Sequence, residues 1–167
     1  MRKALKFSFL LSVLLPCVGC DQATKSVARK LLTTSDPTSL LNGFIRFEYV
    51  ENPGAFLGMG AQLPGAIRFL IFVVFTGTML AVMLLLLIKE RADDPTQLIG
   101  LALLAAGGTG NLIDRIVNEG RVVDFVSLGL GPVRTAVFNV ADVAVMAGAM
   151  LLLYGLMRHQ GKSPRAA

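Results

Sequence analysis

The chain has 167 residues, a net charge of +5 and a hydrophobic content of 54%. A soluble domain averages about 45–50% apolar residues in dispersed periodic patterns, whereas here they form long runs, which excludes an ordinary soluble domain. The basic residues cap these runs and form no stripe with aromatic residues, so the charge does not indicate binding to nucleic acid. We therefore expect one polytopic membrane domain over residues 1–167.

The first apolar segment predicts a transmembrane helix over about 4–27, although its continuous apolar part, 7–20, is short for a span. A basic start followed by an apolar run and Cys20 also fits a lipoprotein signal cleaved before that cysteine. Against this alternative, Cys17 stands where such signals usually carry Leu, and the rest of the chain is itself membrane-embedded. The two cysteines lack a second ligand pair, so we interpret them as small apolar residues.

The segment 28–66 interrupts the apolar pattern. Residues 33–37 have loop chemistry, and Asn42-Gly43 favours a tight turn. Apolar and charged side chains then alternate over 44–50, which predicts a strand, and Asn52-Pro53-Gly54 ends it in a turn. We expect a small β element that rests on the membrane surface.

Three further spans are predicted, at 67–88, 97–114 and 136–157. Each run is long enough to cross about 30 Å of hydrocarbon at about 1.5 Å per residue, or nearly so. Small residues are concentrated at 105–110, where they allow a neighbouring helix to approach closely.

Basic residues are densest at the N-terminus, in the short loop 89–96 and in the tail 158–167. The positive-inside rule places all three in the cytoplasm, so 28–66 and 115–135 are expected outside.

This topology brings four acidic residues to the outer end of the helices, although ionisable groups at membrane depth cost about 3 kcal/mol unless they are paired or hydrated. We expect Asp124 in the second outer loop and Asp142 six residues into the last helix, about 9 Å below its outer end. The four acids are Asp21, Asp114, Asp124 and Asp142.

Two carboxylates that face each other supply what an aspartic protease requires. They share a proton, so that one takes a proton from water while the other donates to the scissile carbonyl oxygen. Asp124 and Asp142 both lie among apolar neighbours, and each is a candidate for this pair. The mechanism needs neither a nucleophilic side chain nor a metal or cofactor. For either acid alone, structural pairing with Arg115 or Arg121 is the simpler interpretation.

Other polar groups allow more than one interpretation. Asp21 and Lys25 are spaced as an ordinary i,i+4 ion pair. Asn111, Asp114 and Arg115 suit binding of a peptide carbonyl or a neighbouring loop, although a salt bridge at the helix end has the same composition.

Two different kinds of protein compete with an aspartic protease. A Ser/Lys hydrolase would use Lys25 with Ser26 or Ser127, but adjacent residues do not face each other on a helix. A small proton- or ion-coupled transporter subunit would use Asp114 and Asp142 as a relay, but we see neither paired broken helices nor an internal repeat.

Five motifs in order carry a family resemblance: Asp21-Gln22-x-x-Lys25, Asn52-x-Gly54-Ala55-Phe56, Gly107-Gly108-x-Gly110-Asn111-x-x-Asp114-Arg115, Val123-Asp124-Phe125 and Phe138-Asn139-x-Ala141-Asp142. They resemble the lipoprotein signal peptidase (signal peptidase II) family of bacterial membrane aspartic proteases. The resemblance implies an all-α membrane protein with four transmembrane helices, a small periplasmic β-cradle and a periplasmic loop between helices three and four.

The resemblance also implies a location in the bacterial inner membrane, with both termini cytoplasmic and the active site on the periplasmic side. The implied substrates are diacylglyceryl prolipoproteins, cut before the lipidated Cys, and the implied inhibitors are of the globomycin type. Membrane lipid is a further expected partner. By this resemblance the catalytic pair is Asp124 and Asp142. The residues expected to bind substrate or support the pair are Asp21, Lys25, Asn52, Gly54, Gly108, Asn111, Asp114, Arg115 and Asn139.

Overall fold

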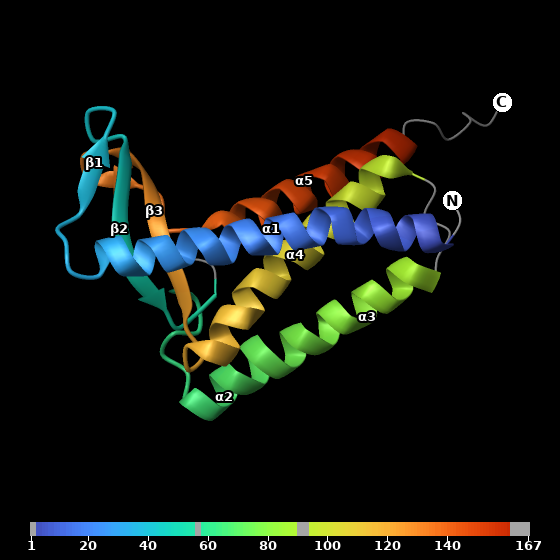
Figure 1. Ribbon diagram of the computed structural model, residues 1–167, viewed down its shortest axis with the longest axis horizontal. Coiled ribbons are helices and arrows are strands. Elements are labelled where there is room, and N and C mark those ends of the chain that lie inside the picture. Colours follow the sequence, from blue (N-terminus) through green and yellow to red (C-terminus); the bar gives the residue numbers. More distant parts are fainter. Residues whose placement is uncertain (1–2, 56–57, 90–93, 161–167) are drawn as a thin grey trace.

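The computed structural model describes residues 3–55, 58–89 and 94–160, and has long helices side by side with a small sheet at one end (Figure 1). The start of the first helix and the end of the last lie at the end of the bundle away from the sheet. The helices are α1 (Lys3–Leu32), α2 (Gly65–Phe69), the π-helical turn η2 (Leu70–Phe75), α3 (Thr76–Lys89), α4 (Pro95–Val117) and α5 (Val140–Gln160).

Four helical stretches among the described residues are long and apolar enough to cross a membrane. The second is continuous through α2, η2 and α3, and it begins two residues before the predicted 67–88. The predicted cytoplasmic loop and tail fall mostly on 90–93 and 161–167, which lie outside the described residues.

The last helix begins at Val140, so the predicted start near 136 is wrong. The residues before it are held in extended conformation because Phe138 pairs with Val126 and Thr135 donates its N–H to the Leu128 carbonyl. Asp142 consequently lies in the first turn of α5 and not about 9 Å below the helix end.

The sheet has four antiparallel strands in the order β1 (Thr38–Leu40), β2 (Ile45–Asn52), β3 (Val122–Leu130) and β4 (Val133–Arg134). The predicted strand at 44–50 is confirmed as β2. The segment between α4 and α5 contributes β3, so Asp124 lies on a strand and not in an irregular loop. A register shift after Phe47 aligns Val50 with Asp124 and Asn52 with Val122.

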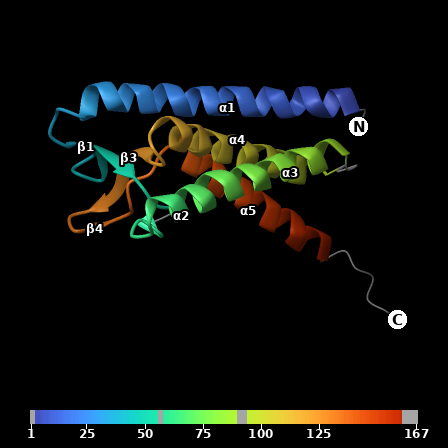
Figure 2. The same cartoon turned by 90° about the horizontal axis from the view of Figure 1, so that it is seen from below.

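Helix α4 packs directly against α5 (Figure 2). A Cβ added at Gly107 would lie 2.3 Å from the Ala141 carbonyl oxygen, and one at Gly148 would lie 2.6 Å from the Gly100 carbonyl oxygen. The two backbones are therefore in contact, as the small residues of α4 predict. This packing fixes the start of α5 against the sheet end of α4.

Candidate active site

The carboxylate of Asp124 accepts one hydrogen bond on each oxygen. The Asn139 side-chain amide donates to Oδ1 at 2.6 Å, and the Asn52 amide donates to Oδ2 at 3.1 Å. Strand β2 supplies Asn52 and the residue before α5 supplies Asn139, so two segments distant in sequence hold this acid. Its side chain is buried, with 2% of the residue exposed.

Asp142 is held by the first turn of its own helix. The Asn139 backbone N–H donates to Asp142 Oδ2 at 3.1 Å, while the Asp142 N–H donates to Asn139 Oδ1 at 2.9 Å. This reciprocal arrangement is a capping box at the N-terminus of α5. The remaining oxygen, Oδ1, accepts from the Asn111 side chain at 2.8 Å.

Asn139 joins the two acids, because its side-chain oxygen binds the Asp142 backbone while its nitrogen donates to Asp124. Burial, followed by the nearby negative charge of Asp142, raises the pKa of Asp124 to about 6, although hydrogen bonds from Asn52 and Asn139 oppose the rise. A carboxyl with this pKa exchanges its proton near neutral pH, as a general acid or base requires.

A buried ion cluster lies next to this pair. The Lys25 ammonium contacts Asp21 Oδ2 at 2.9 Å, Asp114 Oδ2 at 3.1 Å and Asn111 Oδ1 at 3.0 Å. Its three N–H donors therefore have three acceptors. The predicted i,i+4 pair of Asp21 and Lys25 is present, but as part of a cluster that joins α1 to α4.

The two acids of the cluster also fix the elements around them. Asp21 Oδ1 accepts the Ala141 backbone N–H at 2.9 Å, in the first turn of α5. Asp114 Oδ2 accepts the Val123 N–H at 2.9 Å, next to Asp124 on β3. The ion cluster thus positions both backbone segments that carry the acid pair.

Asn111 connects the ion cluster to the acid pair. Its oxygen accepts from Lys25 and, at 3.2 Å, from the Asn139 amide, while its nitrogen donates to Asp142. Because the ammonium binds only an acceptor, Lys25 determines which end of the amide faces Asp142.

Arg115 holds the turn that follows β2. Its guanidinium donates to the Gly54 carbonyl at 2.8 Å and lies 5.3 Å from the centre of the Phe72 ring. The same turn is closed by the Gly54 N–H, which donates to Asn52 Oδ1 at 2.9 Å. A Cβ at Gly54 would lie 2.6 Å from the Met59 carbonyl oxygen, so this position requires glycine. Arg115 therefore binds a peptide carbonyl of a neighbouring loop, and this bond fixes the backbone beside Asn52.

A Cβ at Gly108 would lie 2.8 Å from the Leu80 side chain, so this glycine lets α3 and α4 pack closely. Its expected role in binding substrate or supporting the acid pair stays a prediction. Gln22 is a site residue that sequence reasoning missed: its amide donates to Asp114 at 2.9 Å and to the Gly110 carbonyl at 3.1 Å. Its place beside Asp21 in the first motif is the signal that could have identified it.

The residues on which the alternative interpretations depend have other partners in the structure. Ser127 donates to Glu48 at 3.0 Å and accepts from Arg134, while the Lys25 donors are occupied, so no Ser/Lys pair forms between them. Arg121 pairs with Glu51 at 2.9 Å and not with either catalytic candidate. Within residues 3–55, 58–89 and 94–160, no three His, Cys, Asp or Glu side chains are grouped to hold a metal ion.

Four apolar helices in the described part of the chain, with buried Asp124 and partly buried Asp142 at the sheet end, define a multi-pass membrane protein with a polar site at one end of its bundle. Comparison with known proteins gives the family. Residues 13–158 match the family model described as Signal peptidase (SPase) II. The chain belongs to the signal peptidase II family, and is therefore a membrane protease.

Individual relatives agree with this membership. A lipoprotein signal peptidase of Syntrophus aciditrophicus is 35% identical over 140 residues, covering 84% of this chain and 86% of the relative. One from Pelotomaculum thermopropionicum is 34% identical over 157 residues, covering 94% and 97%. A solved bacterial membrane enzyme superposes with a TM-score of 0.81 at 25% identity, covering 96% of this chain and 94% of that one.

Proposed function

We propose that the chain is an aspartic endopeptidase that removes the signal peptide from diacylglyceryl-modified prolipoproteins, cutting on the N-terminal side of the lipidated Cys. Membership of the signal peptidase II family supports the substrate class. The observation that carries the mechanism is the shared Asn139 amide, which ties Asp124 and Asp142 into one hydrogen-bonded unit.

In the proposed reactive state the two acids share one proton, and Asp124 holds it. Asp124 is buried beside a second acid, and its pKa is raised to about 6. Asp142 accepts a backbone N–H in the first turn of a helix, where the helix dipole favours a negative charge. In this proposal Asp124 therefore acts as the acid and Asp142 as the base.

Catalysis then follows from these protonation states. Asp142 takes a proton from a water molecule as the water oxygen attacks the scissile carbonyl carbon, and Asp124 gives its proton to the carbonyl oxygen. The tetrahedral intermediate collapses when the C–N bond breaks. Asp142 returns its proton to the leaving amine, and Asp124 regains one from the intermediate.

The membrane explains why the acids lie where they do. A substrate with two acyl chains does not readily leave the bilayer, so its protease must present acids at the hydrocarbon boundary. We propose that α3, α4 and α5 hold the signal helix and acyl groups in a groove open to lipid, with the Asn52 turn as a cover. In the proposed orientation this end is periplasmic, the termini are cytoplasmic, and the protein lies in the bacterial inner membrane.

The test expresses the chain in membranes with a diacylglyceryl prolipoprotein and follows release of the signal peptide on a gel. The wild type is compared with Asp124→Asn, Asp142→Asn and the matched control Asp36→Asn, whose side chain is exposed in a loop. We expect cleavage by the wild type and the control alone, and its inhibition by globomycin. Full cleavage by either dyad variant would refute the aspartic mechanism.

A further inference from the structure

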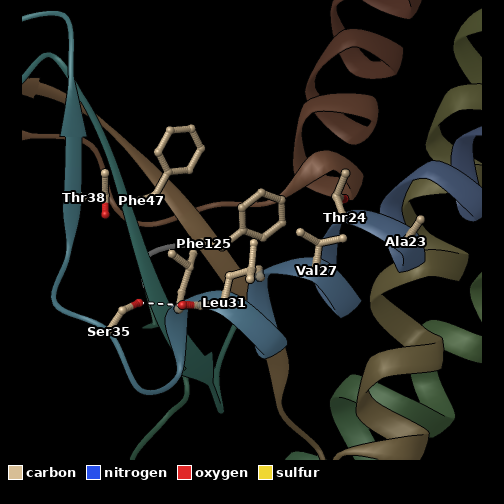
Figure 3. Close-up of a pocket in the computed structure, with 10 residues that line it drawn as sticks. Ala23, Thr24, Val27, Leu31, Ser35, Thr38, Phe47 and Phe125 are labelled. Atoms are coloured by element: carbon tan, nitrogen blue, oxygen red, sulfur yellow. Dashed lines mark hydrogen bonds between the residues drawn. The ribbon is translucent and has the colours of Figure 1, made fainter.

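A cavity of about 530 Å³ lies between the last turns of α1 and the sheet (Figure 3). Its size falls in the range of about 300–1,000 Å³ that is typical of small-molecule sites. The residues that line it are Ala23, Thr24, Val27, Ala28, Leu31, Leu32, Ser35, Thr38, Phe47 and Phe125.

The residues that line this cavity have few groups free to form hydrogen bonds with water. The Thr24 hydroxyl donates to carbonyls of its own helix, at 2.9 Å from both the Cys20 and Asp21 oxygens, and the Ser35 hydroxyl donates to Leu31. Two of its three hydroxyl groups are therefore already bonded to backbone, and the remaining lining is mostly aliphatic and aromatic. Apolar cavities exclude water, and such a space is filled best by an apolar group.

The cavity adjoins the lipid-facing surface. Val27 and Leu31 are 54% and 65% exposed on a helix that is long and apolar enough to span a membrane. Nearby, the turns after β1 and β3 meet where Arg134 donates to the Gly43 carbonyl at 2.8 Å. These turns and the strand ends beside them expose a further group of large apolar side chains: Leu40, Leu41, Phe44, Leu130 and Val133. Helix and sheet thus both present apolar surface beside the cavity.

The cavity is separated from the candidate active site by buried charge. Asp21 and Lys25 lie on a different face of α1 from Val27 and bind α4, and both are nearly inaccessible to solvent. Neighbouring side chains of a strand point to opposite faces, so Phe125 in the cavity and Asp124 in the acid pair lie on opposite faces of β3. The candidate occupant is a lipid of the surrounding bilayer, because exposed Val27 and Leu31 line the cavity on an apolar helix.

One charged residue fits the head group of such a lipid. Lys30 follows Val27 by one helical turn and is exposed. It makes no hydrogen bond or ion pair with another residue in the described part of the chain. A phospholipid phosphate lies at the level where an acyl chain leaves the hydrocarbon, and a basic residue there attracts it.

We infer that this cavity binds one acyl chain of a bilayer phospholipid, drawn from the leaflet on the sheet side, with its phosphate beside Lys30. The bound chain fills the space between α1 and the sheet and so joins the first helix to the platform that carries Asp124. This inference does not depend on the proposed peptidase mechanism.

The test places the full-length protein in vesicles of phosphatidylethanolamine and phosphatidylglycerol, with a diazirine near the end of one phosphatidylglycerol acyl chain. Irradiation and mass spectrometry of peptides locate the labelled residues. We expect label on Phe125, which is only 8% exposed and lies on no helix face. Lys30→Ala is expected to lower this label about fivefold, the contribution of one basic residue near a membrane surface.

Matched variants distinguish the cavity from general lipid contact. Ala23→Trp fills the cavity and should abolish label on Phe125, while Ala81→Trp adds the same group to the exposed face of α3 and should leave it unchanged. Wild-type protein labelled on exposed helix faces but not on Phe125 would overturn the inference. Labelling of Phe125 by a photoreactive acyl chain of a prolipoprotein, in place of the phospholipid, would overturn it too. The labelling is repeated with Asp142→Asn, and the same label on Phe125 is expected, because lipid binding in the cavity does not require peptidase activity.

Discussion

The raised pKa of Asp124 makes a quantitative prediction about stability. The difference between the ordinary value of 3.8 and about 6 corresponds to about 3 kcal/mol at 1.36 kcal/mol per pH unit. Because the folded state holds this proton more tightly than the unfolded state, the proton stabilises the fold at low pH. That stabilisation is lost as the pH rises through 3.8 and is gone above about 6. Asp124→Asn removes this titration.

The assay measures the free energy of unfolding in detergent micelles from pH 4 to pH 8, for the wild type and for Asp124→Asn. We expect the variant to gain about 2 kcal/mol relative to the wild type between pH 4 and pH 8, because part of the total is already lost at pH 4. The altered hydrogen bonds to Asn52 and Asn139 add a cost that does not change with pH. Asp36→Asn, at an exposed position, should show no comparable trend. A difference between wild type and Asp124→Asn that stays constant with pH, or that falls, would refute the reasoning.

Three further predictions follow from the site and its packing. In the free enzyme kcat/KM should fall as the pH rises through about 6, because Asp124 then loses the proton that it donates in the proposed mechanism. A rate profile that keeps rising to pH 8 would contradict this. Lys25→Met should destabilise the fold by about 3–5 kcal/mol, because it leaves two buried carboxylates without their cation. The control Lys30→Met, at an exposed position, should cost little, and thermal unfolding of the two variants tests this. Gly107→Ala should destabilise the fold by about 1–3 kcal/mol through overpacking against α5. The control Gly19→Ala should not destabilise it, because nothing lies within 4 Å of the added Cβ. Equal thermal transition temperatures for the two variants would contradict this prediction.

The sequence predicted the spans and the end of the molecule at which the acids meet, because long apolar runs and basic flanks are local signals. It did not predict the start of α5. Apolar residues 136–138 read as helix, but Phe138 is held extended by Val126 on β3. Strand β3 was missed for the same reason, since its partner β2 lies about seventy residues earlier and pairing of this kind leaves little trace in either segment.

The same distinction holds for the candidate site: its local features were predicted from the sequence, and its contacts between helices were not. Residue type and apolar neighbours made Asp124 and Asp142 each a candidate, and the family resemblance predicted them as the catalytic pair. The bridge through Asn111 was not predicted, because it depends on the orientation of one amide between Lys25 and Asp142. Such an orientation is set by contacts between different helices, and spacing along the chain carries no information about it.

The bridge from Lys25 through Asn111 to Asp142 has a consequence for biogenesis. Its three members enter the membrane with the first, third and last long helices, in the order of synthesis. A nascent chain that has not yet delivered α5 carries Asp124 but neither Asp142 nor the Asn139 amide that unites the two acids. Peptidase activity of the proposed kind therefore arises only when insertion is complete.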